Sequence, residues 1–119
     1  MHALTIEDES LIAIFIEDTL RECGFTSFDV VVSMEDAVAA AGRQCPDLIT
    51  ADVQLNPGSG IDAVELICSG PPIPVLFITG TPTEVTRRMP KHVILLKPFE
   101  PAELARVVQS LMVRTNKSA

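Results

Sequence analysis

The sequence predicts one α/β domain in which five parallel strands alternate with five helices. Short apolar runs bounded by turn residues alternate with segments of helical periodicity along the whole chain. This alternation is typical of a parallel sheet with helices on both faces, because each crossover returns the chain to the same direction. The length of 119 residues suits one packed core, and we find no internal repeat or linker. We therefore expect a doubly wound five-stranded parallel sheet.

The strands are expected where β-prone apolar residues gather in short runs. The third is central, because the apolar run from Leu48 to Ala51 fits a strand that is buried on both faces. Asp52 would stand at the carboxyl end of this strand, which is the edge where open α/β sheets bind ligands. The expected strands cover residues 3–6, 28–32, 47–52, 74–79 and 92–96.

The helices are expected between these strands. Ser33 is the expected N-cap of the second helix, and the fourth helix must stop by Pro90 and is therefore short. The domain is expected to occupy residues 1–114, with a C-terminal tail at 115–119. The core stripe of the first helix comprises Ile12, Ile16, Leu20 and Cys23. The expected helices cover residues 11–23, 34–44, 60–69, 81–90 and 100–113.

The charge and cysteine content of the chain disfavour several classes of function. The net charge is −7; residues 1–65 hold 13 acidic residues against two basic ones, and residues 66–119 hold three against seven. An acidic chain is a poor ligand for the nucleic-acid backbone. No apolar run approaches the ~18 residues that span a bilayer, and no secretion signal is visible. Three widely spaced cysteines fit neither a disulfide framework nor a zinc motif, so we expect a cytoplasmic protein without nucleic-acid or membrane partners.

Polar residues follow four of the expected strands. Glu7 and Asp8 follow the first, Asp52 the third, Thr79 ends the fourth and Lys97 follows the fifth. In a doubly wound sheet these ends lie along one edge, so the side chains can converge on one site. Close carboxylates repel each other unless a cation lies between them, and Mg²⁺ accepts oxygen ligands while leaving room for a phosphoryl oxygen. A lysine and a hydroxyl beside such a centre suit the binding of a phosphoryl group.

Five parts of the chain together resemble the bacterial response-regulator receiver domain, the phosphoacceptor of two-component signalling. The resemblance spans residues 3–112 and implies a flavodoxin-like fold with strand order 2-1-3-4-5, in a single-domain protein of a phosphorelay. The run at 77–80 is similar to a receiver subgroup with Phe-Ala-Thr-Gly at this place. The motifs are Ile6-Glu7-Asp8-Glu9, Pro46-Asp47-Leu48-Ile49-Thr50-Ala51-Asp52, Gly60, Pro74-Val75-Leu76-Phe77-Ile78-Thr79-Gly80 and Leu96-Lys97-Pro98-Phe99.

The resemblance also implies the roles of the acidic residues. Asp52 would be the phosphoacceptor. Asp8, Asp52 and the backbone carbonyl of Gln54 would ligate Mg²⁺, with Glu7 acting through water. The protein would not be an enzyme in the ordinary sense, because it would assist only its own phosphorylation and dephosphorylation.

Two further residues are implied to contact the phosphoryl group, and two positions depart from the family pattern. Thr79 and Lys97 would contact the phosphoryl oxygens, and the bond from Lys97 to the proline that follows would be cis. The switch aromatic that receivers carry three residues before the lysine is replaced by Ile94. The aromatic that follows Phe-Ala-Thr-Gly in the subgroup is replaced by Thr81. The phosphoryl site is therefore complete, whereas the usual output residue is missing.

The partners implied are a histidine kinase or a histidine phosphotransfer protein, a downstream protein of unknown identity, and a second copy of the chain as an open alternative. Leu11, Ile14 and Phe15 fall outside the core stripe of the first helix, close in sequence to the acidic residues. Exposed apolar residues beside a reactive site more often mark an interface, so we expect these three to dock the phosphodonor. Coverage of one or two of them by the last helix or its loop is the competing explanation.

Three rival functions are consistent with the same fold class. A phosphorylation-independent interaction module is favoured by the missing aromatic and opposed by the complete site. An aspartyl-phosphate hydrolase would need an acid two residues after the nucleophile, where Gln54 cannot donate a proton. A flavin or redox domain is disfavoured because the chain has no Trp or Tyr and no glycine-rich loop after the first strand.

Overall fold

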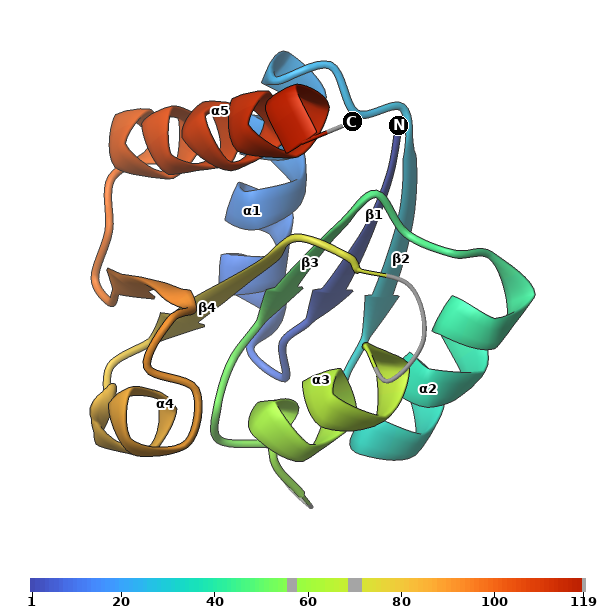
Figure 1. Ribbon diagram of the computed structural model, residues 1–119, viewed down its shortest axis with the longest axis vertical. Helices are drawn as coiled ribbons and strands as arrows, with labels where there is room; N and C mark the ends of the chain where they lie inside the picture. Colours follow the sequence, from blue (N-terminus) through green and yellow to red (C-terminus); the bar gives the residue numbers. More distant parts are fainter. Residues whose placement is uncertain (56–57, 69–71, 119) are drawn as a thin grey trace.

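The computed structural model of the protein describes residues 1–55, 58–68 and 72–118, and five parallel strands form its one sheet (Figure 1). The strands are β1 (His2–Ile6), β2 (Ser27–Val31), β3 (Leu48–Ala51), β4 (Val75–Thr79) and β5 (Val93–Leu96). Their spatial order is β2-β1-β3-β4-β5, with all pairs parallel. The predicted flavodoxin-like sheet is confirmed, and each strand begins and ends within one residue of its expected bounds.

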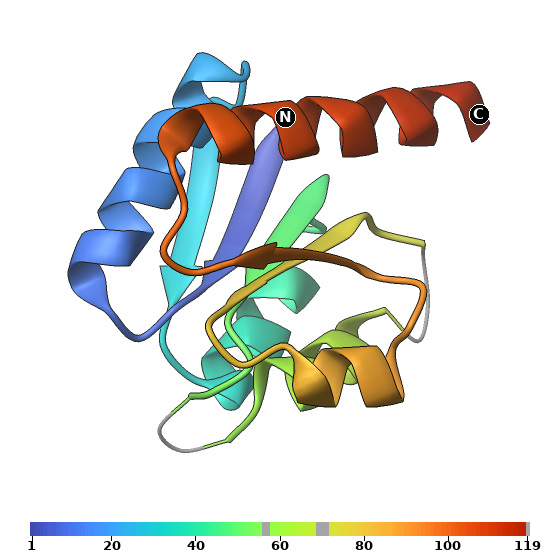
Figure 2. The same ribbon diagram turned by 90° about the vertical axis from the view of Figure 1, so that its left-hand side faces the viewer.

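Five helices cover the two faces of the sheet. They are α1 (Ser10–Glu22), α2 (Met34–Arg43), α3 (Gly60–Ile67), α4 (Thr83–Arg88) and α5 (Pro101–Ser118). Figures 1 and 2 show α1 and α5 together on one face, and α2, α3 and α4 on the other. None of the described helices is long and apolar enough to cross a membrane.

Each face of the sheet has its own apolar core. Residues of β1, β3 and β4 are buried throughout, because helices cover both sides of these inner strands. Alternate strand residues enter opposite cores. The core under α1 and α5 includes Ala3, Leu48, Leu76, Ile16, Leu20, Leu104 and Val108. The core under α2, α3 and α4 includes Leu4, Ile6, Ile49, Phe77, Ala37, Val64 and Val85.

The helices differ from the sequence predictions at their ends. The final helix continues to Ser118, so the prediction of its end at Val113 was wrong. The division of the chain into a domain at 1–114 and a tail at 115–119 stays a prediction. Residues 114–118 contain neither glycine nor proline, so nothing in them breaks a helix. The third helix ends at Ile67, two residues before its expected end. The residues expected to break it are Gly70, Pro71 and Pro72, of which Gly70 and Pro71 lie outside the described residues.

The first helix buries a slightly different face from the predicted stripe. Ile16 and Leu20 are buried as expected, whereas Ile12 and Cys23 are only half-buried. Ala13 and Thr19 are buried as well. The buried face of this helix is therefore rotated from the predicted stripe toward the smaller residues Ala13 and Thr19. Gly24, with φ +100°, then reverses the chain in a conformation that favours glycine.

The fourth helix is short, as predicted, and ion pairs that the sequence did not predict hold it to α3. Val85 is its one buried residue among those described, so little apolar surface holds it. The guanidinium of Arg88 donates to Asp62 and to Glu65 of α3, each at 2.7 Å. These ion pairs tie α4 to its neighbour across the surface of the molecule.

Gly60 provides a test of the close packing between β3 and the start of α3. A methyl group at Gly60 would overlap the carbonyl oxygen of Asp52, which is backbone and cannot move aside as a side chain can. We expect Gly60→Ala to lower the free energy of unfolding by about 2–3 kcal/mol, the usual cost of overpacking. Urea denaturation measures this change.

Gly42 is the matched control, because a methyl group there meets no atom within 4 Å. Gly42→Ala lies within α2 and should raise the free energy of unfolding by about 0.5–1 kcal/mol. Equal changes in the two variants would contradict the close contact at Gly60.

Candidate functional site

The carboxyl ends of the inner strands meet at one edge of the sheet, and the backbone fixes the residues that follow them. The Glu7 amide donates to the Val31 carbonyl at 3.0 Å, which extends the pairing of β1 with β2. The Asp52 amide donates to the Ile6 carbonyl at 2.9 Å, which extends the pairing of β3 with β1. Both acidic residues are therefore held by the sheet itself and not by a free loop.

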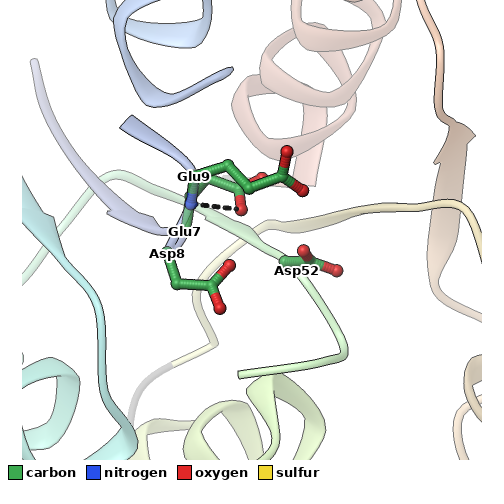
Figure 3. A group of neighbouring side chains, drawn as sticks. All are labelled: Glu7, Asp8, Glu9 and Asp52. Carbon is green, nitrogen blue, oxygen red and sulfur yellow. Dashed lines mark hydrogen bonds between the residues drawn. The ribbon is translucent and has the colours of Figure 1, made fainter. Parts of the chain in front are cut away.

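Four carboxylates gather at this edge (Figure 3). One oxygen each of Glu7, Asp8, Glu9 and Asp52 lies within 4.8 Å of the others. Glu7 is 2% exposed and Asp52 is 7% exposed, whereas Asp8 and Glu9 face solvent. The Glu9 amide donates to Glu7 Oε2 at 3.2 Å. The prediction that Glu7, Asp8 and Asp52 lie close together is confirmed. Glu9 also belongs to the cluster, which was not predicted from the sequence.

The ammonium group of Lys97 lies among these carboxylates, as predicted. Its Nζ is 2.7 Å from Glu7 Oε1, 2.9 Å from Asp52 Oδ2 and 3.6 Å from Glu9 Oε1. The bond to Asp52 has good hydrogen-bond geometry, whereas Glu7 Oε1 has no well-aligned donor among the described residues and makes a close ion pair. One cation thus bridges two nearly buried anions.

Burial and charge act in opposite directions on this cluster. Burial raises the pKa of the Glu7 carboxyl, and the contact with Lys97 opposes that rise without cancelling it. Burial by itself would lower the pKa of Lys97, but its contacts with Glu7 and Asp52 outweigh burial and raise it. Lys97 therefore carries its charge throughout the physiological pH range.

Thr79 lies at the end of β4, beside the cluster, but its hydroxyl is engaged elsewhere. The Lys97 amide donates to the Thr79 carbonyl at 3.0 Å, which places the two residues on adjacent strand ends. The Thr79 hydroxyl accepts the Thr81 amide at 3.0 Å and lies 3.2 Å from the Thr81 hydroxyl. The site is therefore assembled around Asp52 and Lys97, with the Thr79 side chain bound to the following loop.

Gln54 contacts Asp52 through its backbone amide. Its amide donates to Asp52 Oδ1 at a long 3.4 Å, and the residue forms an isolated bridge with Ser59. The role of its carbonyl as a metal ligand stays a prediction. The peptide bond between Lys97 and Pro98 is cis, as the family resemblance implied.

The family model of the response regulator receiver domain matches residues 3–109 of the chain. The chain belongs to the response-regulator receiver family. Among curated proteins, it is 37% identical to the phyllosphere-induced regulator PhyR of Methylorubrum extorquens, over 92% of this chain and 42% of the relative. It is 32% identical to the transcriptional regulatory protein CreB of Escherichia coli, over 94% of this chain and 51% of the relative. The chain thus spans about half or less of the curated relatives it matches.

Solved structures agree with this family and with the fold. The response regulator PhyR from Brucella abortus superposes with a TM-score of 0.90 at 32% identity, covering 98% of this chain and 49% of that one. The receiver domain of the sensor histidine kinase PA1611 from Pseudomonas aeruginosa was solved with magnesium coordinated in its active-site cleft. It has a TM-score of 0.79 at 28% identity and covers 93% of this chain and 96% of that one.

The acidic residues of this receiver fit a hard divalent cation. Carboxylate oxygens are the ligands that Mg²⁺ prefers, and the four at this edge converge from two strand ends. The ammonium of Lys97 already lies between two of them, so the arrangement is built around a positive charge. Exposed Asp8 and Glu9 leave one side of the cluster open to solvent and hence to a hydrated ion.

The predicted docking residues of the receiver lie on the surface. Leu11, Ile14 and Phe15 are 72%, 52% and 57% exposed, so the competing prediction that α5 covers them is wrong. Phe15 borders a groove of about 470 Å³ between α1 and the segment after β5. Because the groove also reaches Lys97, an occupant would lie beside the acidic cluster. The lining comprises Glu9, Ile12, Phe15, Lys97, Pro98, Phe99 and Pro101.

The ion pairs of Lys97 with Glu7 and Asp52 should contribute to the free energy of unfolding. Its side chain is 15% exposed, and Lys97→Met would leave two nearly buried carboxylates without their cation. Removing one partner of a fully buried pair costs ~3–5 kcal/mol, and partial exposure reduces this, so we expect a loss of about 2–3 kcal/mol in metal-free protein. Urea denaturation with a chelator present measures it.

Lys91→Met is the control, because Lys91 is exposed and the structure gives it no ion pair within the described residues. It should change the free energy of unfolding by less than about 0.5 kcal/mol. An unchanged stability of Lys97→Met would show that the cluster does not depend on the lysine.

Proposed function

We propose that this receiver accepts a phosphoryl group on Asp52 from a histidine kinase or a histidine phosphotransfer protein, and signals through contacts with another protein. The observation that carries the proposal is the position of Asp52: nearly buried at the end of the central strand, with Lys97 2.9 Å from Oδ2. A carboxylate in this position can act as a nucleophile, while the neighbouring cation neutralises charge on the incoming group.

The chemistry asked of the protein is a single transfer. A carboxylate oxygen of Asp52 forms a bond to phosphorus while the bond from phosphorus to the donor's imidazole nitrogen breaks. The imidazole keeps the electron pair and takes a proton from solvent. Lys97 would hold phosphoryl oxygens through its ammonium. The protein would assist only its own phosphorylation and the later hydrolysis of that phosphoryl group. We therefore do not class it as an enzyme with a separate substrate.

We infer that Asp8 and Asp52 would hold Mg²⁺, with the Gln54 carbonyl as third protein ligand and Glu7 acting through water. When bound, the ion supplies charge neutralisation at the acceptor and the phosphoryl oxygens. The convergence of the acidic oxygens supports this assignment. We also infer a cytoplasmic location, which the three free cysteines among the described residues support.

The output of the receiver is proposed to pass to a protein partner. A related structure, the anti-anti-sigma factor PhyR from Bartonella quintana, is 36% identical over 98% of this chain and 49% of that one. The name anti-anti-sigma factor denotes a protein directed against another protein, which supports a protein partner for this receiver. Ile94, in place of the usual aromatic, is half-buried against the core under α4, so the output must use another residue.

Asp52→Asn tests the proposed acceptor. Incubation of the protein with acetyl phosphate and magnesium should add the mass of one phosphoryl group, and Asp52→Asn should add none, because an amide oxygen is a far weaker nucleophile. Omission of magnesium should slow the reaction strongly. Asp47→Asn is the control, because Asp47 precedes the same strand at its opposite end and should label normally.

If Asp52→Asn and the unchanged protein were labelled equally, the acceptor assignment would be wrong. If no phosphodonor labelled either the unchanged protein or Asp52→Asn, a phosphorylation-independent interaction module would be the better explanation of this chain.

Phe15→Ala tests the docking of the donor. Phe15 is exposed beside the groove that reaches Lys97, so a helical donor would bury it on approach. Truncation of an aromatic anchor costs ~1–2 kcal/mol, so transfer from a phosphorylated histidine phosphotransfer protein should slow about tenfold. Labelling by acetyl phosphate should not change. Val38→Ala, exposed on α2 on the other face, is the control. If Phe15→Ala slowed both the transfer from the protein donor and the labelling by acetyl phosphate, Phe15 would have a structural role and not a docking role.

Thr81→Ala tests how the Thr79 hydroxyl enters the reaction. This hydroxyl lies 3.2 Å from the Thr81 hydroxyl, which competes with a phosphoryl oxygen for its proton. Removing the competitor should speed labelling by acetyl phosphate about fivefold, the equivalent of one net hydrogen bond of ~1 kcal/mol. Thr83→Ala, at the exposed start of α4, should have no effect. Slower labelling of Thr81→Ala would mean that Thr81 positions Thr79 productively.

A further inference from the structure

A second groove lies on the other side of α1 from Phe15. It has a volume of about 300 Å³ and runs between α1 and the edge strand β2. Its walls are apolar although they face solvent: Ile14 is 52% exposed, Val30 45% and Val32 52%. Among the described residues, the lining comprises Glu7, Ser10, Ala13, Ile14, Glu17, Val30 and Val32.

The groove differs from the one beside Phe15 in its charge. Of the described residues that line it, the two ionisable ones are Glu7 and Glu17, which are acidic, and none is basic. It also belongs to the part of the chain, residues 1–65, that holds 13 acidic residues against two basic ones. An acidic peptide or a nucleic acid would be repelled here, whereas a cation with an apolar stem would be attracted.

The chain itself shows how a guanidinium fits between α1 and β2. One helical turn beyond Glu17, the Arg21 side chain lies with its guanidinium carbon 4.6 Å from the centre of the Phe28 ring. Its Nη2 is 3.7 Å from Glu17 Oε1. Phe28 precedes Val30 by two residues on the same face of β2, so this arginine lies at the neighbouring position along the same helix–strand junction.

We propose that the groove between α1 and β2 is a docking site for a partner protein that inserts an arginine or lysine side chain flanked by apolar residues. The aliphatic stem would pack on Val30 and Val32, and the cationic head would pair with Glu17, as Arg21 does next to it. The site lies apart from the Phe15 groove and does not require phosphorylation of Asp52. Phe15 would thus serve the phosphodonor on one side of α1, and Ile14, which the sequence had grouped with it, would serve the basic partner on the other side.

The experiment uses the full chain with labelled amide and methyl groups, and a defined probe, the peptide acetyl-Leu-Arg-Leu-amide. Titration should shift the methyl resonances of Ile14, Val30 and Val32 in a saturable manner. The matched peptide with citrulline, which has the shape of arginine without its charge, should bind about fivefold more weakly, the value of one modest ion pair.

Four variants separate this site from its surroundings. The double variant Val30→Thr with Val32→Thr keeps β-branched residues at the end of β2 and just after it, and should abolish the shifts. Glu17→Gln should lower the affinity for the arginine peptide about fivefold. Arg21→Gln should strengthen peptide binding, because the variant lacks the arginine that competes with the peptide for Glu17. If Glu17 and Arg21 served only to stabilise the fold, the substitution would not increase the affinity. Val38→Thr, on the far face, should bind normally. The Val30/Val32 double variant should accept phosphate from acetyl phosphate at the normal rate.

Three results would overturn the proposal. The first is equal binding of the citrulline and arginine peptides. The second is peptide-induced shifts confined to the Phe15 groove or to Asp8 and Asp52. The third is self-association of the chain, seen by sedimentation, that broadens Val30 and Val32 without any peptide, since a second copy would then occupy the groove. Failure of phosphorylation at Asp52 would leave these readouts unaffected, so the two proposals are tested separately.

Discussion

The ion pairs of Lys97 are the interaction on which this end of the molecule depends. Two carboxylates, those of Glu7 and Asp52, are almost completely buried and close together, a combination that one protonation or one cation must relieve. The ammonium of Lys97 relieves it from the end of a different strand. Because the lysine comes from β5 and the acids from β1 and β3, the cluster forms only when three separate strands reach their places in the sheet. The site and the sheet order therefore depend on each other.

The sheet gives this cluster its rigidity by continuing past the strands. The amides of Glu7, Asp52 and Lys97 each donate to a carbonyl of the neighbouring strand, at 2.9 to 3.0 Å. The helix that follows β3 then begins so close to the Asp52 carbonyl that only glycine fits at its first position. Side chains on such a backbone have little freedom beyond their own rotamers. Exposed Asp8 and Glu9 are the exception, and they form the open side through which an ion or donor can approach.

The sequence predicted those features that depend on local pattern. Apolar runs such as that from Leu48 to Ala51 located each strand within one residue, because inner strands buried on both faces leave a continuous apolar signal. Polar residues at the ends of those strands located the cluster. Features that depend on where a side chain turns in three dimensions could not be read: the bonding of the Thr79 hydroxyl to Thr81, the ion pairs from Arg88 to α3, and the participation of Glu9. The end of α5 was missed because polar residues without glycine or proline are equally compatible with a tail and a helix.

The arrangement of charge also follows from the strand order. The order β2-β1-β3-β4-β5 puts the first half of the chain, which is acidic, at one side of the sheet and the basic second half at the other. Asp52 ends the strand in the middle, where the sign changes, and Lys97 reaches it from the basic side. A phosphoryl group on Asp52 would add negative charge at this boundary, and Lys97 would have to divide its contacts between that group and Glu7. The Lys97 backbone amide is bonded to the Thr79 carbonyl at the end of β4, and the Thr79 hydroxyl accepts the amide of Thr81 in the loop leading to α4. These hydrogen bonds connect Lys97 through Thr79 to the loop before α4, and none of them involves the residue at position 94.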